Sequence, residues 1–224
     1  DQATFINEPT AFIYSSYVKY QFFDHESLSS AWSSWSYLGS KKILAIGAGF
    51  YQHEKATESL QNGDTTFHSM TSLAIDVFAD MPINNRIFTG YIGLINHNFG
   101  PKFIRMVGAN NPADGSSGLG TLNGKGNSFP ITGTGQILFT QLGLGFKMEN
   151  EQIIQPNISA QFSNFEFVNE SMVLIEGGVS YYLDKHQSKL SISAQRRPVL
   201  TEVNDLVEID SYKMMIIGQY QIRF

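Results

Sequence analysis

The sequence predicts an all-β protein that forms an antiparallel transmembrane β-barrel, and three observations support this prediction. Apolar and polar residues alternate with a period of two in about nine segments, each about as long as a membrane-spanning strand. The connections between these segments alternate between short and long. The last segment keeps its alternation up to a terminal aromatic residue, Phe224. We interpret residues 1–224 as a single barrel domain.

Alternation is clearest in the last segment, residues 211–224. Counted back from the end of the chain, every second residue is apolar or small: Ile222, Tyr220, Gly218, Ile216, Met214 and Tyr212. The residues between them include Arg223, Gln221, Gln219 and Lys213. A period of two places these sets on opposite faces of a strand. An apolar face for lipid, a polar face for the lumen and an aromatic end are typical of the closing strand of an outer-membrane barrel.

The end of this segment also predicts a membrane-assembly signal, formed by Phe224, Ile222 and Tyr220. We expect the barrel-assembly machinery to bind the chain through this C-terminal strand. The expected location is the bacterial outer membrane, where lipid and lipopolysaccharide surround the barrel.

The remaining segments follow the same pattern along the chain. They are residues 12–24, 42–51, 71–81, 86–98, 136–148, 155–167, 172–183 and 188–197. One face of each is rich in Leu, Ile, Val, Phe and Tyr, and the other is mostly Ser, Gln, Asn and Gly. The segment 86–98 contains glycine, and its facing stays open. A soluble β-sandwich alternates in the same way and is the alternative fold, although its outward face is usually charged.

Two kinds of connection join the segments. Residues 80–86, 148–152 and 183–187 are short polar turns, whereas 52–70, 101–134 and 199–210 are longer and rich in Gly, Asn, Asp or Ser. Short turns on one rim and long loops on the other are typical of membrane barrels. Bacterial single-chain barrels have an even number of strands. About nine segments therefore predict a missed strand, a strand contributed by residues 1–10, or further strands before this part of the chain.

Composition excludes several other classes. The 224 residues are 42% hydrophobic, 16% charged and 13% aromatic, with no cysteine and a formal charge of −5. No apolar run approaches the ~20 residues of a transmembrane helix. Without cysteine there is no disulfide and no thiolate metal site. The negative charge argues against a nucleic-acid partner.

Four stretches resemble porins of the Bacteroidota, in particular the phosphate-selective porin O/P-like family. They are residues 20–27 (YQFFDHES), 37–50 (YLGSKKILAIGAGF), 73–80 (LAIDVFAD) and 178–195 (GVSYYLDKHQSKLSISAQ). The resemblance implies a barrel of about sixteen strands, of which this chain would supply the C-terminal nine. It also implies a homotrimer or a larger outer-membrane complex.

Charged residues on the proposed inner face are predicted to line the pore. The cations are Lys102, Arg105, Lys125, Lys147, Lys189, Arg197, Lys213 and Arg223, and the acids are Asp76 and Asp80. Three of the cations lie in the connection 101–134, which is the predicted constriction because connections of this length are usually functional or disordered. A basic lumen favours anions. The alternative is that these cations are paired with acids.

No catalytic or metal-ligating pattern accompanies these residues. The five histidines are scattered and show no zinc-binding spacing. Asp64 and His68 lie near the proposed outer rim without a paired-acid motif. We therefore predict a porin for passive diffusion of small solutes, with anions as the favoured class, and no enzyme activity, cofactor or metal. The alternative function is a non-conducting barrel that acts as a structural or accessory subunit of an outer-membrane complex.

Overall fold

The computed structural model describes residues 2–6, 11–26, 36–107, 129–203 and 206–223. These residues form strands, turns and irregular connections. Within these ranges, no helix is long and apolar enough to cross a membrane. Ten strands form one antiparallel sheet, and a separate pair, β6 (Ile104–Val107) and β7 (Phe129–Gly133), forms a second.

Nine strands of the large sheet are long. They are β2 (Ile13–Gln21), β3 (Ile43–Gln61), β4 (Asp64–Ile83), β5 (Arg86–Asn98), β8 (Gly135–Lys147), β9 (Ile153–Phe165), β10 (Met172–Asp184), β11 (Ser188–Val203) and β12 (Leu206–Ile222). The tenth, β1 (Thr4–Phe5), pairs with β3 beyond the part of β3 that β2 covers. The predicted all-β class and its nine alternating segments are confirmed.

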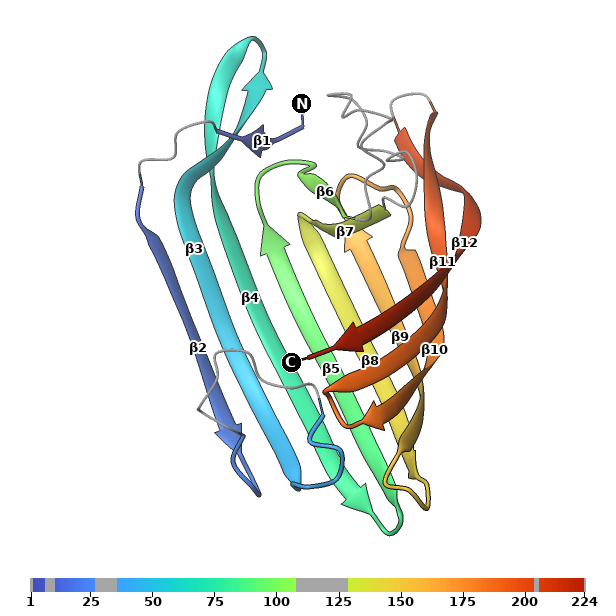
Figure 1. Cartoon of the computed structure of the whole chain (residues 1–224). Coiled ribbons are helices and arrows are strands. Elements are labelled where there is room, and N and C mark those ends of the chain that lie inside the picture. Colours follow the sequence, from blue (N-terminus) through green and yellow to red (C-terminus); the bar gives the residue numbers. More distant parts are fainter. Residues whose placement is uncertain (1, 7–10, 27–35, 108–128, 204–205, 224) are drawn as a thin grey trace.

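The sheet is curved and open (Figure 1). Its path runs through β3, β4, β5, β8, β9, β10, β11 and β12, with β2 at the β3 edge. Among the described residues, no pairing joins β2 to β12, so the sheet is not closed into a barrel. We call the side toward which it curls the concave face and the opposite side the convex face.

Each end of the sheet carries one set of connections. The turns at 84–85, 148–152 and 185–187 lie at one end, here named the turn rim, at the bottom of Figure 1. The connection between β5 and β8 lies at the opposite end, the loop rim. The connection between β2 and β3, residues 22–42, is also at the turn rim. It was not among the long connections predicted from the sequence. Since consecutive strands alternate in direction, β2 and β12 both run from the loop rim to the turn rim.

Two predicted long loops are wrong. Residues 52–70 continue β3 and β4 up to a tight turn at Asn62 and Gly63, where φ is 53° and 90°. An Asn-Gly pair with positive φ is the favoured two-residue hairpin turn. Residues 199–210 similarly continue β11 and β12. The extension of β3 is mostly polar, so apolar alternation did not detect it, whereas the extensions of β11 and β12 carry Leu200 and Val207, which pack in an apolar cluster.

Two apolar clusters lie at the loop rim. In one, Ile104 of β6 packs with Ile137, Phe165 and Met172 from β8, β9 and β10. In the other, Ala3 packs with residues of β3, β4 and the segment after β5. Gln161 of β9 also donates a hydrogen bond to the backbone oxygen of Ile131 in β7, at 3.2 Å. The pair β6–β7 therefore covers the upper part of the concave face.

Candidate functional site

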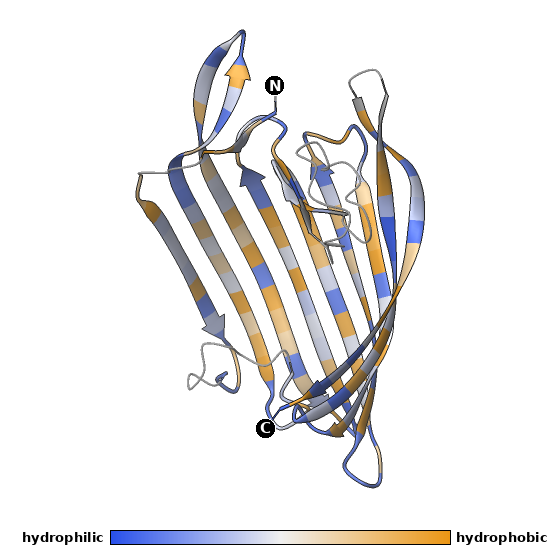
Figure 2. Ribbon diagram, turned by 45° about the horizontal axis from the view of Figure 1, so that its top comes forward, coloured by the Kyte–Doolittle hydropathy of each residue, from blue (hydrophilic) through white to orange (hydrophobic). Residues whose placement is uncertain are grey.

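The convex face exposes large apolar side chains. Leu73 is 62% exposed, Ile192 60% and Ile216 77%. Figure 2 shows the pattern behind this exposure: orange apolar residues alternate with paler or blue residues along the strands. A soluble protein rarely leaves a contiguous apolar surface of this kind uncovered.

Strand register joins these side chains into rows across the sheet. Ile75 of β4 lies opposite Leu94 of β5, and Leu94 lies opposite Leu138 of β8. Leu138 in turn lies opposite Phe162 of β9. One register therefore aligns the apolar faces of four strands into a single continuous band.

Polar residues end the band on the loop-rim side. Asn96 lies opposite Gln136, and Gln136 lies opposite Asn164, two residues beyond the row just described. On β8 the band extends from Leu138 to Phe146. That length agrees with the ~9–11 residues that cross a bilayer as a tilted strand.

The concave face is polar over its central part. One row joins Gln141, Ser159, Glu176 and Gln195 through the register of β8, β9, β10 and β11. The Gln195 amide donates to a Glu176 carboxylate oxygen at 2.9 Å. Buried polar groups need such partners. The sheet therefore has an exposed apolar side and an internal polar side.

The most strongly curled part of the sheet encloses a hollow of about 520 Å³ on the concave side. Amides and hydroxyls of β8 to β12 supply most of its walls: Gln141, Gln155, Asn157, Ser180, Ser191 and Gln219. Glu176, Lys189 and Arg223 are its charged wall residues, and His186 and Ser36 lie at the turn-rim side.

Residues 36–38, in the connection between β2 and β3, cross the concave side at the turn rim. The Tyr37 backbone N–H donates to Asp80 at 3.1 Å, and the Thr89 hydroxyl donates to the other Asp80 oxygen at 2.8 Å. The His186 Nε2 donates to the Ser36 carbonyl at 2.7 Å. Segment 36–38 is thus held between β4 and the turn that follows β10.

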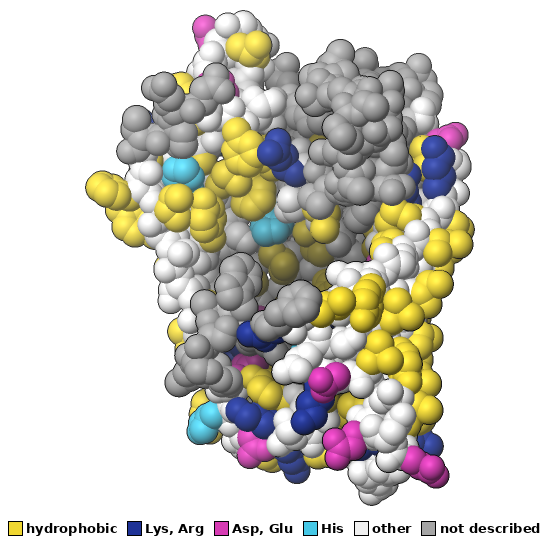
Figure 3. Space-filling view, in the orientation of Figure 1, with side chains coloured by type: hydrophobic (Ala, Val, Ile, Leu, Met, Phe, Trp, Pro, Cys, Tyr) yellow, Lys and Arg dark blue, Asp and Glu magenta, His cyan; other side chains and the backbone are white. Residues whose placement is uncertain are grey.

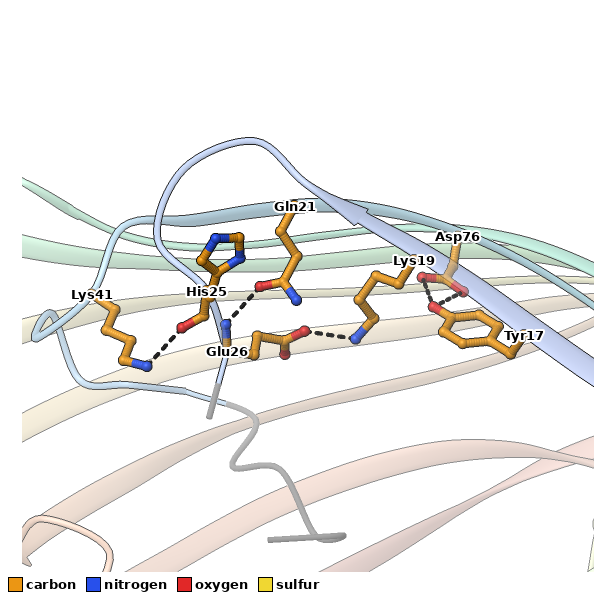
Figure 4. Close-up of polar contacts among 7 residues, drawn as sticks. All are labelled: Tyr17, Lys19, Gln21, His25, Glu26, Lys41 and Asp76. Atoms are coloured by element: carbon orange, nitrogen blue, oxygen red, sulfur yellow. Dashed lines mark hydrogen bonds and ion pairs between the residues drawn. The ribbon is translucent and has the colours of Figure 1, made fainter. Parts of the chain in front are cut away.

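The start of the same connection is tied to β2 (Figure 4). Lys19 forms an ion pair with Glu26 at 2.7 Å, and the Glu26 backbone N–H donates to Gln21 at 2.6 Å. The Tyr17 hydroxyl reaches across β3 and donates to Asp76 at 2.9 Å. These contacts hold the polar side of the edge strand β2 against the concave face.

The predicted pore-lining cations lie in separate places. Lys189 and Arg223 line the hollow, whereas Lys147 is exposed at the turn rim. Arg197 and Lys213 are cross-strand neighbours on β11 and β12. Near β6, the Arg105 guanidinium lies 4.7 Å from the Phe5 ring centroid, and Lys102 is exposed. Lys125 lies outside the described residues. The described cations do not form one ring.

The two predicted acids are engaged in hydrogen bonds. Asp76 accepts from Tyr17, and Asp80 is fully buried beneath segment 36–38. The predicted assembly signal ends β12: Tyr220 and Ile222 are on the convex face, 59% and 50% exposed, and Phe224 lies outside the described residues. In Figure 3 charged side chains gather at the turn rim, while apolar side chains cover the flank formed by β11 and β12.

Sequence reasoning missed the contribution of segment 36–38. Nothing in the Ser-Tyr-Leu sequence distinguishes an inward-folded segment from an ordinary turn. The neutral walls had a detectable signal, because Gln, Asn and Ser alternate with apolar residues along 155–163 and 188–195. At the loop rim, the imidazole of His68 contacts the Ser59 hydroxyl at 2.8 Å. Within the described ranges, no group of three or more His, Cys, Asp or Glu is placed to hold a metal ion.

No protein-family model, curated protein or solved structure matches this chain.

Proposed function

We propose that this chain forms the wall of an outer-membrane porin that allows passive diffusion of small polar solutes. The observation that carries the proposal is the inverted polarity of the sheet. The convex face exposes apolar side chains such as Ile216, and the concave face presents polar ones such as Gln141. A membrane strand needs this arrangement, with lipid outside and water inside.

A soluble sandwich requires the opposite arrangement. Its two sheets bury their apolar faces against each other. Within the described ranges, the small sheet β6–β7 packs on the concave side, and the apolar convex face carries no second sheet. The sandwich alternative therefore finds no support in this fold.

Strand length also supports a membrane location. The strands β5, β8, β9 and β10 each have 13 residues. At about 3.3 Å per residue such a strand is about 43 Å long, and at a tilt of about 45° it crosses about 30 Å. This distance equals the thickness of the hydrocarbon core of a bilayer.

Closure of the lumen needs additional strands. Because β2 and β12 run in the same direction, they cannot pair with each other in an antiparallel barrel. Any all-antiparallel closure must therefore add an odd number of strands. Seven further strands, at about sixteen in total, satisfy both this parity and the even number of bacterial barrels. The length of the encoding reading frame upstream of Asp1 tests this point. A frame too short to encode even one further strand would count against it.

The proposed orientation rests on the long connection between β5 and β8 and on the extended strand pairs β3–β4 and β11–β12, which all lie at the loop rim, although the connection between β2 and β3 at the turn rim is also long. Short periplasmic turns and longer external loops are typical of these barrels. The turn rim would then face the periplasm, and the connection between β5 and β8 would lie outside. The anion preference stays a prediction, and the described cations are dispersed over the two rims, the hollow, and β11 and β12.

Planar-bilayer conductance of the full-length protein tests the function. A steady open channel is the expected result. Absence of conductance from protein that is folded and inserted would favour the alternative, a non-conducting barrel that acts as an accessory subunit. Segment 36–38 gives this alternative a structural basis, because it crosses the turn-rim side of the hollow.

A further inference from the structure

We propose that the hollow binds a small neutral polyhydroxylated solute, such as a mono- or disaccharide, in preference to an anion. The proposal rests on the proposed porin function, because it names the solute class that the same lumen takes. The volume of the hollow, about 520 Å³, falls within the range of small-molecule sites.

The chemistry of the walls is the first argument. The hollow is lined mainly by the neutral polar groups of β8 to β12, which are primary amides and hydroxyls. Each primary amide offers both donors and an acceptor, and each hydroxyl can do either. A sugar hydroxyl likewise donates and accepts. An inorganic anion mainly accepts, and even hydrogen phosphate donates through only one or two hydroxyls, so it would leave most of the acceptors of these walls unused.

Charge placement is the second argument. Lys189 and Arg223 lie together at the turn-rim end, because the Arg223 backbone N–H donates to the Gln187 carbonyl in the turn before Lys189. Glu176 lies nearer the loop-rim end of β10. Six positions separate Glu176 from Tyr182, the cross-strand neighbour of Lys189. At about 3.3 Å per residue, this separation is about 20 Å. A carboxylate thus lines the part of the hollow that lies away from the two cations, and it disfavours an anion there.

Several wall groups are already held in place. The Tyr182 hydroxyl donates to Gln155 at 3.0 Å, and the Gln155 amide donates to Thr89 at 3.3 Å. The hydroxyls of Ser180 and Ser191 are 3.0 Å apart on neighbouring strands. Groups fixed before binding lose less conformational entropy when a ligand arrives. These uncharged wall groups are therefore ordered enough to recognise a neutral solute.

Titration calorimetry on the detergent-purified full-length protein tests the proposal, with maltose as the neutral probe and inorganic phosphate as the anion. Saturable maltose binding is expected, together with weaker phosphate binding. Gln141→Leu and Gln219→Leu should each weaken maltose binding about three- to tenfold, the effect of one lost hydrogen bond. The matched control is Gln136→Leu on the convex face, which should leave binding unchanged.

Three results would overturn the site. They are the absence of saturable maltose binding, equal effects of all three substitutions, and phosphate binding that exceeds maltose binding and disappears in Lys189→Gln together with Arg223→Gln. Conductance on the same preparation separates the two proposals. Open channels without maltose binding would reject the sugar site and leave the porin, whereas maltose binding without channels would reject the porin and support the site.

Discussion

Asp80 carries a carboxylate yet is fully buried on the concave face. Its two oxygens accept one bond from the Tyr37 backbone and one from the Thr89 hydroxyl. A buried carboxylate is costly unless such partners satisfy it. The sequence predicts Asp80 as a pore-lining acid, and this stays a prediction. In the structure Asp80 lies on the concave face and anchors segment 36–38.

Removal of this anchor should destabilise the protein. Asp80→Ala should lower the free energy of unfolding by about 3 kcal/mol, because two hydrogen bonds to a charged group are lost. Trypsin should also cleave faster at Lys41 and Lys42, just after the released segment. Urea unfolding and limited proteolysis measure the two effects. Asp184→Ala, at an exposed residue where β10 ends, is the control and should stay within about 0.5 kcal/mol.

The edge strand β2 depends on two glycines in the neighbouring strand. The Tyr17 side chain lies over Gly47 and Gly49 of β3 on its way to Asp76. A Cβ at position 47 would lie 2.0 Å from the Tyr17 hydroxyl oxygen, so a larger residue there requires the Tyr17 ring to move away. These glycines, which the sequence showed only as part of a polar face, allow a contact that spans β2, β3 and β4.

Gly47→Ala should therefore detach Tyr17 from Asp76. The hydrogen bond joins partly exposed groups, so we expect a loss of about 1 kcal/mol in the free energy of unfolding. Gly177→Ala on β10 is the control, because a Cβ there meets nothing within 4 Å. Chemical denaturation of both variants measures the difference. Equal stability of the two would show that the Tyr17 contact contributes nothing.

The whole molecule has an apolar outer face and a polar inner face. Substitutions at two adjacent residues of β11, one on each face, test whether the apolar face contacts lipid. Ile192 is on the convex face, 60% exposed, and Ser191 is on the concave face. Ile192→Lys should reduce folding into lipid vesicles by about 2–4 kcal/mol, the cost of Lys on the lipid face near the bilayer centre. Ser191→Lys should fold far better, since its side chain faces the wet interior.

Heat-modifiable gel mobility after reconstitution measures the folded fraction of both variants. In a soluble protein the same Ile192→Lys change at an exposed site would have almost no effect. Equal folding of Ile192→Lys and the unsubstituted protein, without detergent or lipid, would exclude the membrane proposal.

The strand ends were less predictable than the strand faces. Residues 86–98 matched β5 to the residue, because Asn84 and Asn85 make the preceding turn, although the facing of this segment stayed open in the sequence. Residues 52–61 were taken as loop because they are mostly polar, and residues 199–203 because they belong to the stretch 199–210, which contains Asn and Asp. A polar strand extension has no apolar face to detect, so its pairing becomes visible only when the partner strand is in place.

Alternation by itself determined which side chains share a face, since a period of two is a property of any extended backbone and needs no partner. Only the tertiary structure decided what those faces enclose. The His186–Ser36 contact joins residues 150 positions apart in the chain, and the cations of one predicted lining were distributed among the hollow, the turn rim and β6. Such placements depend on how far the sheet curls and which connection folds inward, and neither quantity has a local signature in the sequence.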